Sequence, residues 1–353
     1  MVGGAWRVIA SPLAWMWENA ARRRLESTDR AVRLSAPVVS VGNVTVGGSG
    51  KTSLVRWLVE TGVPKGEAVA VLTRGYGRRD EDLRVLRPGG GPPEGPAPSA
   101  SELARLAGDE PMLLSRAGAW VGVGQDRSAG ARAVSRFVDP DLFVLDDGLQ
   151  HRAIARSLDL VVFTKSDLHA PARCLPSGPL RQGPDWRPPE AAWVVAGPDP
   201  RETAMRPGTI GDAFRGWWSA LPGTTGRWVD LGTATLGSWH AGPIEAMEPG
   251  ARPAVAFAGV GRPEGVVEFA ARAGFEVDRV HAFPDHHLYH PGDARELVER
   301  HPDRILLTTE KDAVKLEPGW FGDHPVGVLR RGLEIEEPDL LRDLVARARG
   351  REA

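Results

Sequence analysis

The amino-acid sequence predicts an α/β protein with a mostly parallel sheet, helices on both faces of that sheet, and a second, smaller α/β domain. Three observations lead to this fold class. Short apolar stretches alternate with stretches of helical periodicity from residue 37 onward. A glycine cluster separates the first strand from the helix that follows it, and the alternation weakens over 182–225 before it restarts at 254. Parallel sheets of this kind bind ligands at the carboxyl ends of their strands.

The composition is that of a folded globular protein large enough for two domains. The chain has 353 residues, of which 42% are hydrophobic and 25% are charged. A net charge of −2 provides no overall basic field, so we expect no nucleic-acid partner, and no obligate protein partner is evident. The single cysteine, Cys174, cannot form an internal disulfide, which is typical of the cytoplasm. The sequence contains no run of 18 apolar residues and no secretory signal pattern.

Residues 1–35 are basic and aromatic. They contain six arginines against three acidic residues, and three of the twelve tryptophans, Trp6, Trp15 and Trp17. Helical spacing predicts an amphipathic helix whose apolar stripe is Leu13, Met16, Trp17 and Ala20. Such a helix fits a membrane interface, with tryptophans at headgroup level and arginines near anionic lipid. An ordinary helix docked on the core would show the same pattern.

The expected nucleotide-binding domain covers residues 36–220. We predict its strands at 38–43, 68–74, 119–124, 142–147 and 158–164, and its helices after the glycine cluster, near 101–117 and near 127–136. The run RPGGGPPEGPAPSA at 87–100 is too rich in glycine and proline to pack, so we interpret it as a mobile surface loop.

The glycine cluster, VTVGGSGKTS at 44–53, is typical of a P-loop, in which backbone N–H groups surround a nucleotide's phosphates. The strict pattern has a glycine at the position of Thr45. Lys51 can reach the β- and γ-phosphates, and Thr52 can ligate Mg²⁺. The predicted nucleotide-binding residues are Thr45, Val46, Gly47, Gly48, Ser49, Gly50, Lys51, Thr52 and Ser53.

A metal-bound triphosphate also needs a carboxylate at the end of a neighbouring strand. The run LFVLDD places Asp146 and Asp147 after four apolar residues, so we expect them, with Thr52, to hold the metal. A different class of protein is suggested by Thr164-Lys165-Ser166-Asp167, which resembles the guanine-reading motif of GTPases. Because DDGLQH replaces the DxxG of those switches, a P-loop GTPase or regulatory module is the alternative to a kinase.

We expect the smaller C-terminal domain at 221–353. Its strands are predicted within 254–261, 275–283 and 304–309, and its helices at 263–273, at 292–300 and from about 337. The segment FPDHHLYH at 283–290 contains three histidines near one aspartate, for which zinc binding is the less favoured interpretation. The favoured interpretation is an Asp–His pair that accepts a hydroxyl proton. In the first domain, Asp109 and Glu110 suit either a helix cap or such a base.

Eight segments together resemble one known family. In chain order they are VGNVTVGGSGKT, LTRGYGRR, AGDEPMLL, VLDDGLQHR, CLPSGPLR, FAGVGRPEG, AFPDHHLY and LLTTEKDAVKL, and the resemblance spans residues 38–316. These segments are similar to those of the tetraacyldisaccharide 4′-kinases of lipid A biosynthesis. The resemblance implies ATP-dependent phosphorylation, with Mg²⁺, of the 4′-hydroxyl of a tetraacylated glucosamine disaccharide 1-phosphate. It also implies a peripheral enzyme on the cytoplasmic face of the inner membrane, with residues 1–35 as its interfacial anchor.

The resemblance also implies roles for particular residues. Asp109 and His286 would form the catalytic base, together with Lys51 and Asp147 at the phosphates. Because Asp109 and His286 lie in different predicted domains, we expect a cleft whose closure brings His286 towards Asp109 and excludes water. Candidates for the substrate side are Asn43, Tyr76, Arg78, Glu110, Asp126, Arg127, Gln150, His151 and Asp285.

One motif departs from the family pattern. Many members have LREP where this chain has Leu180-Arg181-Gln182-Gly183, so an amide replaces a carboxylate at Gln182. We assign no role to Gln182.

Overall fold

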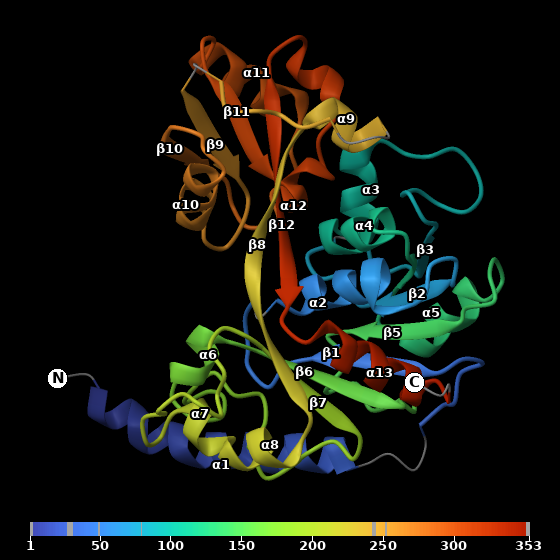
Figure 1. Ribbon diagram of the computed structural model, residues 1–353, viewed down its shortest axis with the longest axis vertical. Helices are drawn as coiled ribbons and strands as arrows, with labels where there is room; N and C mark the ends of the chain where they lie inside the picture. Colours follow the sequence, from blue (N-terminus) through green and yellow to red (C-terminus); the bar gives the residue numbers. More distant parts are fainter. Residues whose placement is uncertain are drawn as a thin grey trace. The chain divides into compact units, whose positions relative to one another are not determined.

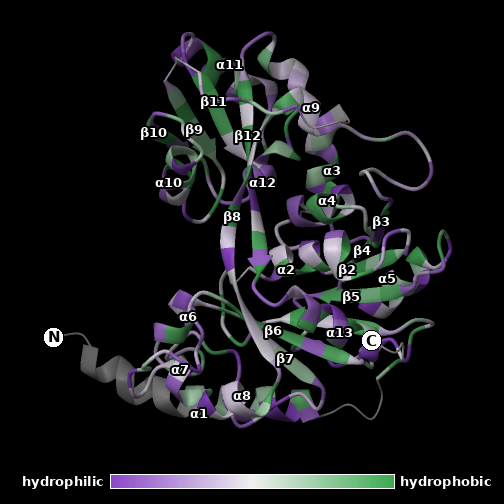
Figure 2. Cartoon of the chain, viewed as in Figure 1, coloured by the Kyte–Doolittle hydropathy of each residue, from purple (hydrophilic) through white to green (hydrophobic). Residues whose placement is uncertain are grey.

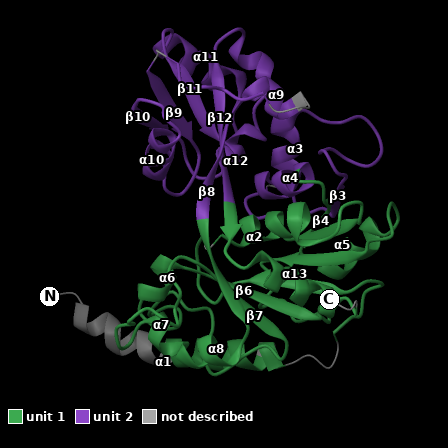
Figure 3. Ribbon diagram, viewed as in Figure 1, with its two compact units in different colours: residues 1–74, 117–227, 333–353 green, residues 75–116, 228–332 purple. Residues whose placement is uncertain are grey.

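The computed structural model describes residues 3–26, 31–48, 50–78, 80–241, 245–250 and 253–350, and the side chains of 3–13, 24 and 241 are outside this description. The chain forms two compact units (Figure 3). Unit 1 comprises residues 1–74, 117–227 and 333–353, and unit 2 comprises 75–116 and 228–332. Each unit is therefore built from separate stretches of the sequence.

Unit 1 contains a parallel sheet with strand order β8-β7-β6-β1-β5-β2-β4. Its strands are β1 (Val38–Gly42), β2 (Val69–Thr73), β4 (Trp120–Val123), β5 (Leu142–Asp146), β6 (Leu158–Thr164), β7 (Ala191–Ala196) and the first part of β8 (Gly223–Thr235). Every residue of β1, β2 and β5 is buried, as both-sided covering of a parallel sheet requires, and Figure 2 shows these strands as largely hydrophobic.

The helices of unit 1 connect and cover these strands (Figure 1). They are α1 (Gly3–Glu26), α2 (Lys51–Trp57) with a π-helical turn (Leu58–Gly62), α5 (Arg127–Val134), α6 (Lys165–His169), α7 (Ile210–Ala213), α8 (Arg215–Ala220) and α13 (Pro338–Ala348). Beside β6 and β7, an aromatic cluster contains Phe163, Trp193, Phe214, Trp217 and Trp218, all buried. Edge-to-face ring contacts, such as Phe163 with Trp218 at 4.9 Å between centroids, stabilise this side of the sheet.

Unit 2 contains a second sheet region with strand order β10-β9-β11-β12-β8, in which β10, β9, β11 and β12 pair in parallel. Its elements are β3 (Arg84–Leu86), α3 (Ala100–Ala107), α4 (Asp109–Arg116), α9 (Leu236–Ala241), β9 (Ala254–Ala258), α10 (Glu264–Arg272), β10 (Val277–Ala282), α11 (Pro291–Arg300), β11 (Ile305–Thr309), α12 (Glu310–Ala313), a 3-10 turn (Pro318–Phe321) and β12 (Val326–Ile335). The chain passes between the units four times: after β2, between α4 and β4, within β8 and near the end of β12.

The fold class predicted from the sequence is confirmed, because the sheet is mostly parallel and carries helices. Two predictions of detail differ from the structure. The helix expected near 101–117 is divided into α3 and α4 at Gly108, whose φ of 95° lies in the left-handed region that ends helices. Residues 75–116, assigned from the sequence to the first domain, belong to unit 2, and residues 333–353, assigned to the smaller C-terminal domain, belong to unit 1. Within the described residues we find no helix with the length and hydropathy of a membrane span.

Candidate active site

The P-loop connects β1 to α2 in unit 1. Gly47 and Gly50 have φ angles of 106° and 82°, a conformation that other residues rarely adopt. Around Gly47 and Gly48 nothing lies within 4 Å of the position a Cβ would take, so the backbone here is accessible to an anion. Val46 is exposed, Lys51, Thr52 and Ser53 are partly buried at the start of α2, and Ser49 lies outside the described residues.

Thr45 holds the start of this loop in place through hydrogen bonds of its side chain. Its side chain is 1% exposed, and its hydroxyl donates to Asp167 Oδ1 at 2.9 Å and accepts from Asn43 Nδ2 at 2.9 Å. Asp167 also closes the capping box of α6 by accepting from the Thr164 backbone N–H and hydroxyl at 2.8 and 2.7 Å. The hydroxyl of Thr45 therefore performs a task that a glycine could not. The Asp167 carboxylate binds the protein itself, which is contrary to the guanine-reading interpretation.

The two carboxylates of LFVLDD lie beside the P-loop strand. β5 pairs with β1 in parallel, with Val41 opposite Asp146, so both strands end at the same edge of the sheet. Asp146 is buried and accepts from Thr73 Oγ1 at 3.2 Å. Asp147 has a φ of 51°, which is strained for a residue with a side chain and occurs most often at functional sites. Two carboxylates and the Thr52 hydroxyl are oxygen donors of the kind Mg²⁺ prefers.

Cations and amides surround Asp147. Lys51 Nζ lies 3.7 Å from Asp147 Oδ1 and 3.3 Å from Asn43 Oδ1. Arg181 Nη1 donates to Asp147 Oδ1 at 2.9 Å and to Gln150 Oε1 at 3.2 Å. Gln150 in turn donates to the Asn43 carbonyl oxygen at 2.9 Å. Arg181 lies in a segment used for the family resemblance, but the sequence alone did not single it out, because its distance from Asp147 in the chain hides their contact.

Two further predicted residues of unit 1, Asp126 and Arg127, have local structural partners, and a third, His151, has a shifted pKa. Asp126 caps α5 by accepting from the backbone N–H groups of Ser128 and Ala129 at 2.8 and 3.1 Å. Arg127 is buried and donates to the Gln125 carbonyl oxygen at 3.0 Å. Burial, with the nearby charge of Arg127, lowers the pKa of His151 to about 4, so this imidazole is neutral at physiological pH. The roles of these residues towards a substrate stay predictions.

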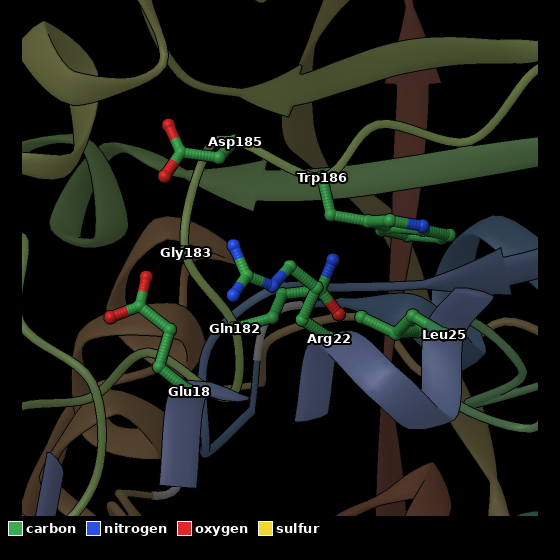
Figure 4. Close-up of a pocket in the computed structure, with 7 residues that line it drawn as sticks. All are labelled: Glu18, Arg22, Leu25, Gln182, Gly183, Asp185 and Trp186. Carbon is green, nitrogen blue, oxygen red and sulfur yellow. The ribbon is translucent and has the colours of Figure 1, made fainter. Parts of the chain in front are cut away.

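A loop after Arg181 contacts helix α1. Trp17 Nε1 donates to the Arg181 carbonyl oxygen at 3.0 Å. A pocket of about 270 Å³, including its open mouth, is lined by α1 and this loop (Figure 4), through Glu18, Arg22, Leu25, Gln182, Gly183, Asp185 and Trp186. A Cβ at Gly183 would lie 2.1 Å from Glu18 Oε1. Because Oε1 is the far end of a flexible side chain, Glu18 could move aside, and this contact alone does not require the glycine that departs from the LREP pattern.

Unit 2 contains the Asp109–His286 pair. Asp109 is the first residue of α4 and is 3% exposed, and its two carboxylate oxygens lie 3.1 and 3.0 Å from His286 Nδ1. An ionised Asp109 can only accept a hydrogen bond, so with that carboxylate the N–H of His286 is on Nδ1. The expectation that the two residues lie in different domains and meet on closure is wrong, because both belong to unit 2 and already form this hydrogen bond.

The charges around this pair favour the ionised carboxylate. Burial alone would raise the pKa of Asp109, but the His286 hydrogen bond and the charges of Lys311 and Lys315 outweigh burial and lower it. Chiefly through the same hydrogen bond, the pKa of His286 is raised. The sequence analysis did not assign Lys311 or Lys315, although both lie in LLTTEKDAVKL.

Several other candidates lie near His286. Tyr76 is exposed, and its ring meets the His286 ring edge-on, with 5.5 Å between centroids. Lys311 Nζ lies 3.3 Å from His286 Nε2, 3.8 Å from Glu110 Oε1 and 3.6 Å from Asp285 Oδ1. Arg78 donates instead to the carbonyl oxygens of Glu81 and Asp82, at 3.1 and 2.6 Å.

The other two histidines of FPDHHLYH both contact Asp293 rather than Asp109. His287 Nε2 lies 3.1 Å from Asp293 Oδ2, and His290 Nδ1 accepts from the backbone N–H of Gly292 at 3.1 Å at the start of α11. Across the part of the chain that the structure describes, no three His, Cys, Asp or Glu residues converge as metal ligands. This arrangement is contrary to the zinc interpretation.

Comparisons with known proteins show the family of this chain. The family model described as tetraacyldisaccharide-1-P 4′-kinase matches residues 6–349. A tetraacyldisaccharide 4′-kinase of Chromobacterium violaceum is 37% identical over 314 residues, which are 87% of this chain and 83% of that protein. The Maricaulis maris enzyme of the same name is 34% identical over 89% of this chain and 83% of its own length. A crystal structure of LpxK from Aquifex aeolicus, in complex with ATP, matches with a TM-score of 0.70 and 26% identity, covering 96% of this chain and 98% of that one.

Proposed function

Because the chain belongs to the tetraacyldisaccharide 4′-kinase family, we propose that it transfers the γ-phosphoryl group of ATP to the 4′-hydroxyl of a tetraacyldisaccharide 1-phosphate. The product is lipid IV-A, an intermediate of lipid A biosynthesis. The observation that carries this proposal is the family match over residues 6–349, which includes both the P-loop and the Asp109–His286 pair. The GTPase alternative has no support, since the relatives are kinases and Asp167 is engaged by Thr45 and Thr164.

Unit 1 provides the nucleotide site of this proposal. The open backbone at Gly47 and Gly48 receives the phosphates, and Lys51 is the mobile cation that neutralises them. Thr52, Asp146 and Asp147 would hold Mg²⁺, to which their oxygens are suited. When bound, the ion neutralises charge on the transferring phosphoryl group. In this structure Lys51 and Arg181 compensate the negative charge of Asp147. A bound Mg²⁺ would take their place as the positive partner of this carboxylate.

Unit 2 provides the base. At neutral pH the lowered pKa of Asp109 keeps its carboxylate ionised, so it can accept the proton of the sugar hydroxyl. His286 orients this carboxylate by donating from Nδ1. The left-handed φ of His286, 60°, is a strained conformation that supports a functional role for its position.

The acyl chains of the substrate keep it in a bilayer, so we propose that the protein binds the cytoplasmic face of the inner membrane peripherally, through α1. Trp15, Met16 and Trp17 support this proposal, because they are 67, 59 and 46% exposed although they are large and apolar. Leu13 of the predicted stripe and Trp6 lie outside the described side chains.

Vesicle sedimentation tests the membrane proposal. The Trp15→Ser/Met16→Ser variant leaves the Trp17 hydrogen bond to Arg181 in place, and we expect it to bind anionic vesicles about tenfold more weakly. The control is Leu83→Ser, which removes an exposed apolar side chain from unit 2. Equal binding by wild type and both variants would show that α1 does not enter the interface.

The activity is tested with purified protein, γ-labelled ATP and a panel of glucosamine disaccharides that differ in acylation and in the 1-phosphate. We expect label on the 4′-oxygen of the tetraacylated 1-phosphate, and only weak labelling without acyl chains. Labelling of none of the acceptors, or a strong preference for GTP over ATP, would contradict the proposed function.

A further inference from the structure

A buried lysine contacts the catalytic pair from the protein interior. Lys315, which follows α12, is 1% exposed, and its Nζ lies 3.6 Å from Asp109 Oδ2 and 2.8 Å from Asp312 Oδ1. Asp312 is itself fully buried, and its Oδ2 accepts from Thr309 Oγ1 at 2.8 Å and from the Gly259 N–H at 3.2 Å. The ammonium of Lys315 therefore joins the carboxylate of Asp109 to an anchored carboxylate of α12.

Burial of the Lys315 ammonium costs free energy, and this cost indicates that its charge has a role. Removing an ammonium from water costs several kcal/mol, and a methionine of similar length would fill the same space without that cost. The compensation here comes from two carboxylates and from the ring of Tyr289, whose centroid lies 5.3 Å from Nζ. One of those carboxylates, Asp109, is the base of the proposed reaction.

We propose that Lys315 is a positioning residue for phosphoryl transfer, which holds the Asp109 carboxylate in its anionic form and in place against His286. This inference rests on the proposed kinase function and adds a residue to it. The sequence pattern gave no indication of it, since lysines are rarely buried and this one is distant from Asp109 in the chain.

The other charged groups near the pair differ from Lys315 in their exposure. Lys311 contacts His286 but is partly exposed, and it also contacts Glu110 and Asp285. Asp285 Oδ2 lies 3.9 Å from His286 Nε2 and is exposed. Tyr76 faces the His286 ring from the solvent side. Water and opposite charges screen these groups, whereas the contact of Lys315 with Asp109 is screened least.

The sign of the effect on pH dependence follows from the charge. Only the ionised carboxylate of Asp109 can accept the sugar proton, and the ammonium of Lys315 favours that ionised form. Without the ammonium of Lys315, Asp109 stays protonated to higher pH. The acidic limb of the kcat/KM profile must then move to higher pH, because a protonated Asp109 cannot accept the sugar proton.

The test compares wild type with Lys315→Met and with Asp312→Asn/Lys315→Met. The double variant removes both charges of the buried ion pair, so it avoids leaving the Asp312 carboxylate uncompensated. Thermal unfolding, the Kd for ATP and the pH profile of kcat/KM are measured for each protein. We expect an unchanged Kd, a loss of kcat/KM of at least about tenfold near pH 6, and a much smaller loss near pH 9.

The double variant also distinguishes the effect of Lys315 on Asp109 from its effect on the charge of Asp312. We expect it to regain the stability that Lys315→Met loses and to keep the displaced acidic limb. A double variant with the wild-type profile, a loss that is equal at all pH values, or a double variant that does not fold would overturn the proposal. If wild type itself transfers no label to the lipid acceptor, the proposed function fails instead.

Discussion

Gly77 offers a direct way to move His286 without changing either catalytic side chain. Its φ is 80°, and a Cβ at this position would lie 2.9 Å from His286 Nδ1 and 3.0 Å from His286 Cγ. Non-bonded heavy atoms prefer roughly 3.5 Å, so Gly77→Ala must displace the imidazole by about 0.6 Å or move the backbone by a similar amount. Only a glycine leaves room for the imidazole in its observed position.

The expected loss can be worked from the hydrogen bond. His286 Nδ1 lies 3.0 and 3.1 Å from the oxygens of Asp109, and a shift of about 0.6 Å away from them exceeds the usual limit of a hydrogen bond. Misplacement of a catalytic group by about 1 Å costs up to ~10²-fold in rate. We expect Gly77→Ala to lower kcat by a factor of about 10 to 100 and to leave the Kd for ATP unchanged.

Gly89→Ala is the matched control for this measurement. Gly89 has a φ of 85° in the same unit, but nothing lies within 4 Å of its Cβ position. Both variants therefore carry the backbone cost of about 1–2 kcal/mol for a side chain in the left-handed region, and only Gly77→Ala disturbs His286. Steady-state kinetics with the lipid acceptor, together with thermal unfolding, compare them. Equal kcat values for the two variants would refute the role given to the His286 position.

Three further predictions concern the P-loop and the catalytic pair. Thr45→Gly restores the strict P-loop pattern but removes the buried hydrogen bond to Asp167, so chemical denaturation should show that the free energy of unfolding falls by about 1–3 kcal/mol. Thr45→Ser keeps the hydroxyl and should stay near wild type. A Thr45→Gly variant that binds ATP more tightly and loses no stability would contradict this prediction. Asp167→Asn should destabilise α6 and leave the ATP-to-GTP affinity ratio unchanged, and isothermal titration that shows a changed ratio would revive the GTPase interpretation. His286→Ala should reduce the unfolding free energy most between pH 3.8 and 6.5. Because the pKa of Asp109 is lowered from 3.8, its contribution to stability is present above pH 3.8 and is lost as the pH falls further. Because the pKa of His286 is raised from 6.5, its contribution is present below pH 6.5 and is lost as the pH rises further. Denaturation curves should therefore show that wild type and His286→Ala differ less in unfolding free energy both below pH 3.8 and above pH 6.5.

Much of unit 1 could be predicted because local patterns determine it. Buried parallel strands have continuous apolar runs, and β1, β2 and β5 are of this kind. β7, AAWVVA, could not be predicted, because prolines and tryptophans around it obscure the alternation. The same holds for the long strand β8, which contains Gly223, Gly226 and Gly232 and alternates poorly.

The composition of unit 2 could not be predicted from local patterns. No signal near residues 75–116 indicates that this stretch packs with residues 228–332, since only tertiary contacts decide it. Asp109 and His286 are 177 positions apart in the chain, and only the family resemblance paired them. Lys315 was missed for a physical reason as well, because a lysine is expected at the surface until its buried partners are known.

The role of Asp109 as the base is the central claim, and Asp109→Asn tests it most directly. Asparagine keeps the shape of the side chain and can still accept from His286, but it cannot take up the hydroxyl proton. Single-turnover transfer of γ-phosphate to the lipid acceptor is measured beside the Kd for ATP. We predict a loss of transfer rate of at least ~10² with an unchanged Kd. Transfer at the wild-type rate, or an equal loss of ATP binding and transfer, would contradict the account.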